Sequence, residues 1–501
     1  MTGGHTPMYD FFDLIPLRWV AYTRHRWLLA LVVLILAAAL ALGFGWSLAE
    51  FGPIPTIAAA LACGYVALTL WKIEVAYWGV IGIVTLLPFA SLPFKIGFTP
   101  TFLDLTMMGL FFVWLAPIAL GRRTLTLRLT ALEGAVIVFM LLAIGSFVAG
   151  LSHAAMTSYL IRHFAEVLLS IVFFFLVCDT VRDLGRLEHL TRLFLLGAGA
   201  AALLGIVLYF LPDLLTIRLL SALGRVGYPT GDGVLRFIRD DPELMQRATS
   251  TSVDPNVLGS LLNLSLGIAV PQLFAQRPLF KRGWLLGLIA VIGVCLALTV
   301  SRGSWVGVGV AVVALGLVRY PKLLFLVLIA LVLVLALPWT QEYVTHFIEG
   351  IQGEDLSTQM RFGEYKDAFV LISRYPILGV GFAGSPDIDT YIGVASIYFL
   401  IAEEMGLVGL TGFLVIAGIF FYAFWIRRGR ARTNSELEPL WYGLHAAMLG
   451  GLVGGVFDHY FFSLDFHHSV TIFWLLLALA VSATRLLDEI PGVALAAAPD
   501  A

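Results

Sequence analysis

The chain has 501 residues, of which 60% are hydrophobic and 13% charged, with a formal net charge of −2. A soluble protein of this length would carry roughly 25% charged residues, so the composition excludes an ordinary soluble enzyme. The small net charge points to no class of partner, and we expect no nucleic acid. Apolar runs of roughly 20 residues recur along the chain, each long enough to cross a ~30 Å hydrocarbon core as a helix.

The predicted fold is all-α, a polytopic bundle of about fourteen transmembrane helices (range 12–14), because backbone groups in lipid must be hydrogen-bonded within each segment. Two long extracytoplasmic loops, at about 213–254 and 340–400, interrupt the spans. In chain order the predicted spans are 27–48, 53–71, 75–93, 100–120, 130–150, 158–178, 190–212, 255–275, 283–301, 303–319, 321–339, 405–426, 440–457 and 467–484.

Basic residues set the predicted orientation. With the N-terminus inside, the clusters "RRTLTLR", "RPLFKR" and "RRGRAR" all fall on the cytoplasmic side, as the positive-inside rule requires. Both termini are then cytoplasmic, and the chain is expected in the plasma membrane, in contact with its lipids.

The basic residues expected outside gather in the loop after residue 212, at the turn of Arg302 and in the loop after residue 339. Arginines grouped near the outer membrane surface suit an anionic ligand. The alternative is ion pairing with nearby carboxylates, and for Arg302 a side chain that reaches the lipid headgroups. Those carboxylates are Asp240, Asp241, Glu243, Glu354, Asp355 and Glu364.

Three segments in order resemble the O-antigen ligase and O-antigen polymerase family of bacterial membrane glycosyltransferases. They are "RATSTSVDPNVLGSLLNLSLGIAVP" from Arg247, "TVSRGSWVGV" from Thr299, and "RFGEYKDAFVLISRYPILGVGFAGS" followed by "ASIYFLIAEEMGLVGLTGFL". The resemblance covers about residues 245–425 and implies a GT-C-like fold for the transmembrane helical bundle. It divides the chain into N-terminal spans (1–240), a family-like core with the site loops (241–430), and C-terminal spans with a cytoplasmic tail (431–501).

The resemblance implies a glycan donor linked through diphosphate to a polyprenol such as undecaprenol, and a glycan, lipid or protein acceptor on the outer face. Transfer builds negative charge on the departing diphosphate, which guanidinium groups can stabilise bidentately. No carboxylate motif for a metal is evident, so we expect neither metal nor cofactor. The predicted substrate-binding residues are Arg247, Arg302, Arg361, Asn256 and Tyr398.

One position departs from the family pattern. Alignment on Tyr398, Glu404 and Gly406 puts Ala395 where the family carries a histidine regarded as central to transfer. Alanine can neither take nor donate a proton through its side chain. Either another group substitutes, or the chemistry differs, or the chain is a catalytically impaired protein that binds or transports lipid-linked glycans.

Three weak candidates for a catalytic base remain. Glu404 matches a family glutamate whose role is more readily structural, and His459 and His467 belong to the loop "DHYFFSLDFHH" predicted outside. Asp254 is expected to cap a helix beginning at Pro255 rather than to act in catalysis.

Two further patterns have simple structural interpretations. Arg162 and Glu166, at i and i+4, are expected to form an ion pair inside the bundle. The glycines of "PILGVGFAGS" either let the backbone approach a ligand or form a plain turn.

Overall fold

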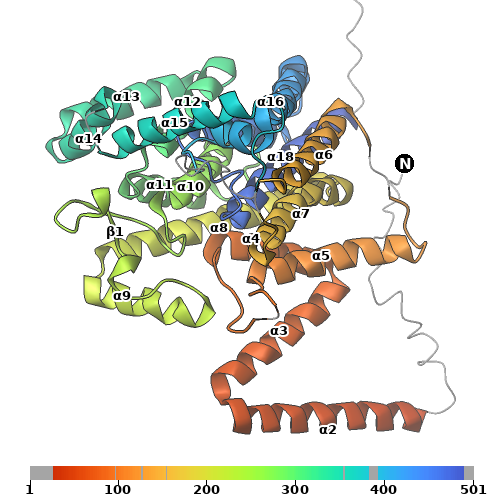
Figure 1. The fold of residues 1–501 in the computed structure, drawn as a ribbon. Helices are drawn as coiled ribbons and strands as arrows, with labels where there is room; N and C mark the ends of the chain where they lie inside the picture. The colour runs from red at the N-terminus through yellow and green to blue at the C-terminus, as the bar shows by residue number, and fades with distance from the viewer. Residues whose placement is uncertain are drawn as a thin grey trace, which may run out of the picture. The chain divides into compact units, whose positions relative to one another are not determined.

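The computed structural model describes residues 26–489 except 96, 126–127, 154, 354–355 and 383–392, and within them the fold is almost entirely helical (Figure 1). One antiparallel strand pair, β1 (Arg236–Phe237) with β2 (Gln246–Arg247), accompanies the helices. The helices are α2 (Arg26–Phe51), α3 (Pro53–Trp71), α4 (Ile73–Leu86), α5 (Phe102–Ala119), α6 (Ala131–Gly150), α7 (Ser158–Thr180), α8 (Leu184–Phe210), α9 (Asp213–Ser221), α10 (Pro255–Ala269), α11 (Arg282–Leu298), α12 (Arg302–Val318), α13 (Lys322–Ala336), α14 (Gln341–Gln352), α15 (Leu356–Arg374), α16 (Ile397–Ala431), α17 (Glu438–Gly454) and α18 (His467–Glu489).

Every predicted span overlaps a helix, although the span predicted at 75–93 continues past the end of α4 at Leu86. Among the described residues, seven helices are long and apolar enough to cross a membrane, or eight if the bent pair formed by α13 with α14 and α15 is one span. The all-α membrane class is therefore confirmed, whereas the crossing of the remaining helices stays a prediction. The segments predicted as long loops contain helices α9, α14 and α15. These helices carry polar residues throughout, so a search for apolar runs does not find them.

The chain divides into two compact units, residues 1–80 with 104–125 and residues 81–103 with 126–501. In the first unit α2 packs on α3, and Ser47 and Thr56 share a hydrogen bond of 3.0 Å. The second unit contains every residue predicted to form the site.

The centre of the second unit is a close packing of α10, α12 and α17. A methyl group at Gly307 would lie 2.5 Å from the side chain of Asn263 and from the carbonyl of Gly450, so only glycine allows this approach. Asn263 Nδ2 donates to the carbonyl oxygen of Gly450 at 2.9 Å and ties α10 to α17. Small residues that bring backbones together are a general device for packing helices in membranes.

The helix directions bring distant segments to one end of this unit. Helices α7 and α18 run parallel. Ser170, in the middle of α7, bonds to Thr471, near the start of α18, at 2.9 Å, and Arg485 near the end of α18 donates to the carbonyl of Cys178 near the end of α7. Gly259 near the start of α10 faces Ser301, which precedes α12. We call the end at which α7, α10, α12, α16 and α18 begin the site end, and the end at which α7 and α18 finish the opposite end.

Candidate functional site

Arg247 ends strand β2 and lies half-buried at the site end. Its Nε donates to the carbonyl of Thr299 at 2.9 Å, and its Nη2 donates to Asn256 Oδ1 at 2.6 Å. Thr299 follows α11 and Asn256 opens α10, so this side chain joins two helix ends. Two of the predicted substrate-binding residues, Arg247 and Asn256, are therefore in direct contact.

Arg361 approaches the same region from α15. Its Nη2 lies 3.8 Å from Oδ1 of Asp458, the fourth residue after the end of α17. Asp458 also interacts electrostatically with Arg247. The ion pair expected for Arg361 thus exists, but with a partner that was not among the carboxylates expected from the sequence.

Arg302 is the first residue of α12, and it contacts the segment that carries Arg361. Its Nη2 lies 3.4 Å from Thr358 Oγ1, one turn before Arg361 on α15. Its guanidinium also packs on Gly350 of α14, where an added methyl group would lie 1.9 Å from Nη1. The neighbouring Gly303 faces Asp458, whose carboxylate lies near Arg361 and Arg247, whereas the Arg302 guanidinium reaches α15 through Thr358.

Burial shifts the pKa values of the charged groups around the arginines. It raises the pKa of the Asp458 carboxyl to about 7, although Arg361 favours the charged form. It also lowers the pKa of the Arg247 guanidinium, an effect that the charge of Asp254 opposes. A carboxyl half neutralised near pH 7 offsets only part of the positive charge, so an anion is favoured beside these arginines.

The backbone around the arginines is strained. Val253 and Val300 have φ angles of 62° and 51°. The left-handed region is unfavourable for β-branched residues and costs of the order of 1–3 kcal/mol at each. Both valines lie in the turns before α10 and α12, where they set the position of the helix starts that carry Asn256 and Arg302.

Asp254 has the structural role expected of it. Its Oδ1 accepts hydrogen bonds from the backbone N–H groups of Asn256 at 2.7 Å and Val257 at 3.2 Å, which caps α10. The hydroxyl of Tyr460 donates to the same oxygen at 3.3 Å. The loop after α17 is therefore bound to the start of α10 next to Arg247.

Tyr398 is the second residue of α16, and Glu404 lies about two turns further along the same helix. The Tyr398 hydroxyl donates to the carbonyl of Leu452 at 2.8 Å, and Glu404 is buried. The backbone N–H groups of Val380 and Gly381 donate to the carbonyls of Glu403 and Glu404 at 2.8 and 2.9 Å.

The glycines of "PILGVGFAGS" allow close contact between backbone segments. Gly379 and Gly381 have positive φ, and added methyl groups would lie 2.4 Å from the carbonyl oxygen of Glu403 and 2.5 Å from Cα of Gly150. Gly406 breaks α16 with a φ of 68° and receives the same segment. Residues 383–385 of this motif are outside the described residues. The described part forms a close-packed turn.

The two candidate histidines lie in different surroundings. His459 packs against Tyr460, and the charges of Asp254, Asp465 and Arg361 act on it. Its Nδ1 is buried and makes no hydrogen bond with the described residues, and burial lowers the pKa of its ring. His467 opens α18, and its Nδ1 lies 3.9 Å from Glu166.

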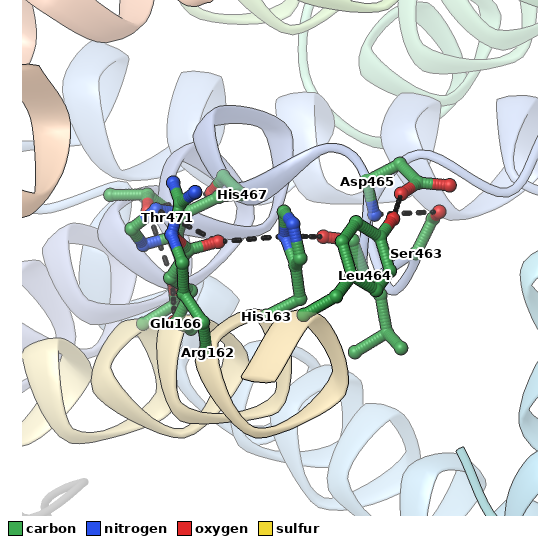
Figure 2. A network of polar contacts seen from close by, with 10 residues as sticks. Arg162, His163, Glu166, Ser463, Leu464, Asp465, His467 and Thr471 are labelled. Carbon is green, nitrogen blue, oxygen red and sulfur yellow. Dashed lines mark hydrogen bonds and ion pairs between the residues drawn. The ribbon is translucent and has the colours of Figure 1, made fainter. Parts of the chain in front are cut away.

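Glu166 is the centre of a second polar network, between α7 and α18 (Figure 2). Arg162 Nε donates to Glu166 Oε1 at 2.8 Å, which confirms the predicted ion pair. His163 Nδ1 lies between Glu166 Oε2, at 3.0 Å, and the carbonyl of Leu464, at 3.1 Å (Figure 2). This network binds the loop before α18 to α7, and so braces the loop that carries Asp458.

The sequence did not predict that Asp458 faces Arg361 or that Gly350 and Thr358 contact Arg302. It also did not predict where Glu364 lies. Oε2 of Glu364 accepts a hydrogen bond from the backbone N–H of Ala395 at 3.0 Å. Glu364 appeared in the sequence only as a possible ion-pair partner. Its spacing of three residues from Arg361 was the available indication that both lie on one face of α15.

Residues 286–414 match the model of the O-antigen ligase family. The matched segment contains Arg302, Arg361, Tyr398 and Glu404, whereas Arg247 and the loop of Asp458 lie outside it. No curated protein matches the chain. Together with the apolar helices, the match identifies a multi-pass membrane protein with a ligase-like role in polysaccharide assembly. Residues 286–414 of the chain therefore form a segment similar to the O-antigen ligase family.

Proposed function

We propose that this protein transfers a glycan from a polyprenyl diphosphate to an acceptor on the outer face of the plasma membrane. The acceptor is a sugar, a lipid or a protein, so the reaction is either ligation or polymerisation of a surface polysaccharide. Both termini are cytoplasmic in this proposal, and the site end faces outward.

The convergence of Arg247, Arg302 and Arg361 carries the proposal. They come from β2, α12 and α15, and the sequence separates the outer two by more than a hundred residues. Among their contacts, Arg247 donates to Thr299 and Asn256, Arg302 reaches Thr358, and Arg361 faces a carboxylate oxygen of Asp458. A diphosphate brings negatively charged oxygens that can form bidentate, charge-assisted hydrogen bonds with guanidinium groups placed in this way.

The chemical role of the arginines is electrostatic. Cleavage of the sugar–phosphate bond leaves its electron pair on the lipid diphosphate, and fixed guanidinium groups stabilise that developing charge without reorganising. The strained turns and the helix cap at Asp254 hold these groups in place before the donor arrives. Helices α14 and α15 supply the surface that covers Arg302.

Reconstitution in lipid nanodiscs tests the function. The purified protein is given a polyprenyl-diphosphate glycan, and release of the lipid diphosphate is measured with and without an acceptor glycan. Release that depends on the acceptor supports transfer. Binding without release favours the second function, a lipid-linked glycan carrier without catalysis, for which Ala395 is the specific observation.

A further inference from the structure

Glu364 has no role in the site described above, although it lies one turn after Arg361 on α15. Residues three apart share a face of a helix, so its carboxylate and the Arg361 guanidinium project toward the same region. Glu364 is half-buried, and its Oε2 is held 3.0 Å from the backbone nitrogen of Ala395. The carboxylate is thus fixed in direction while its side chain remains partly exposed.

Glycosyl transfer to a hydroxyl needs a group that takes the hydroxyl proton. Carboxylates and imidazoles perform this task when they lie within hydrogen-bonding distance of the acceptor. Ala395 cannot, yet its backbone is the point at which Glu364 is anchored. The carboxylate of Glu364 therefore lies beside Ala395, whose own side chain cannot take a proton.

The other candidate bases are less well placed to take a proton from an acceptor hydroxyl. Glu404 is buried in α16 beneath the close-packed glycine turn, and Asp458 is buried and already faces Arg361. His459 packs against Tyr460 and Phe466, and its Nδ1 is enclosed. Of these groups, Glu364 combines partial exposure, a fixed direction and adjacency to a diphosphate-binding arginine.

We propose that Glu364 is the general base that activates the acceptor hydroxyl, an inference that rests on the proposed function. One oxygen of the Glu364 carboxylate takes the hydroxyl proton. The hydroxyl oxygen forms the new bond to the anomeric carbon of the donor sugar. The bond from that carbon to the diphosphate oxygen breaks, and its electron pair leaves with the lipid diphosphate. Protonated Glu364 then returns its proton to water.

The test compares Glu364→Gln with wild type in nanodiscs. Glutamine keeps the size and an oxygen that can accept the Ala395 N–H bond, but it cannot take a proton at neutral pH. Acceptor-dependent release of lipid diphosphate should fall roughly 10²- to 10⁴-fold. Binding of the same donor, measured separately, should stay within about twofold of wild type, because the arginines are unchanged.

Two variants separate catalysis from structure. Asp367→Asn removes a carboxylate one turn further along α15 and should leave release near the wild-type rate. Glu364→Asp keeps a carboxylate with a shorter reach and should retain more activity than Glu364→Gln. Equal losses in the Asp and Gln variants, or a Gln variant as active as wild type, would overturn the assignment of Glu364.

The same experiment distinguishes failure of the base from failure of the function. Wild-type protein that neither binds nor cleaves the donor overturns the proposed function, and the base assignment with it. Active wild type with an equally active Glu364→Gln variant overturns the base assignment alone.

Discussion

Both ends of the second unit are rich in arginine, but the arginines have different partners. At the opposite end Arg182 pairs with Asp179 at 2.5 Å, and Arg485 pairs with Glu133 at 2.6 Å. At the site end Arg247 makes no salt bridge among the described residues, and the Arg361 pair is stretched to 3.8 Å.

The two ends differ in how closely their arginines are paired with carboxylates, rather than in the number of charges. Arginines matched one to one with close carboxylates leave little net field, so they fix helix ends and orientation. Arg247, which is held by carbonyl and amide oxygens, and Arg361, whose carboxylate partner is distant, keep more of their positive charge for a ligand. The comparison predicts that substitutions at the site end act on donor recognition, and those at the opposite end on stability.

The largest effect is expected for Arg302→Ala. Loss of one fixed cation beside the leaving diphosphate should lower release of lipid diphosphate by roughly 10²- to 10³-fold. Arg128→Ala is the matched control at the opposite end, where the exposed ion pair with Glu489 contributes only about 0–1 kcal/mol to stability. Equal effects of the two substitutions on release would remove the distinction between the ends.

Gly350→Ala should act on Arg302 without changing any charge. The new methyl group would lie 1.9 Å from Nη1 of Arg302, so the guanidinium must move. Displacement of this order should lower release by roughly 10-fold or more. Gly363→Ala on α15, where a methyl group meets no atom within 4 Å, is the control. Similar release rates for these two glycine variants would contradict the placement of Arg302.

Asp458 makes donor binding dependent on pH. Its pKa is raised to about 7, so above pH 7 the carboxylate is charged and competes with the diphosphate for Arg361, whereas below pH 7 it is neutral. Donor affinity of wild type should therefore fall by roughly threefold to tenfold from pH 6 to pH 8.

Asp458→Asn removes the titrating group and should abolish most of that pH dependence. Affinity should rise at pH 8 and change little at pH 6. Binding of the lipid-diphosphate glycan, titrated at both pH values, measures the effect. An Asn variant with the full wild-type pH dependence would show that another group titrates.

Arg485→Gln should have the smallest effect on donor binding. It leaves Glu133, which is 1% exposed, without its cationic partner, and an unpaired buried charge costs roughly 3–5 kcal/mol of folding free energy. The thermal unfolding temperature should fall while donor affinity stays at the wild-type value. Reduced affinity in protein that remains folded would show that the opposite end also serves recognition.

The sequence was sufficient to locate the apolar helices, because length and apolar composition are local properties. It also located Asp254 as a helix cap, since capping depends on the next few residues. Helices α9, α14 and α15 were missed because their polar residues hide them from a search for apolar runs.

The site was predictable only in part. Arg247, Arg302 and Arg361 stand out in the sequence as cations predicted on a side that ordinarily lacks them, so the topology prediction was what grouped them. Asp458 and Gly350 carry no local pattern of this kind. Their roles arise from packing of α17 against α12 and of α14 over Arg302, which sequence spacing does not encode.

The most direct test is a cryo-electron microscopy structure of the protein in nanodiscs with a bound polyprenyl-diphosphate glycan. The account predicts both phosphates at the site end, within hydrogen-bonding distance of Arg302 and Arg361 and beside Arg247. Phosphates located elsewhere, with these three guanidinium groups still on their protein partners, would contradict it.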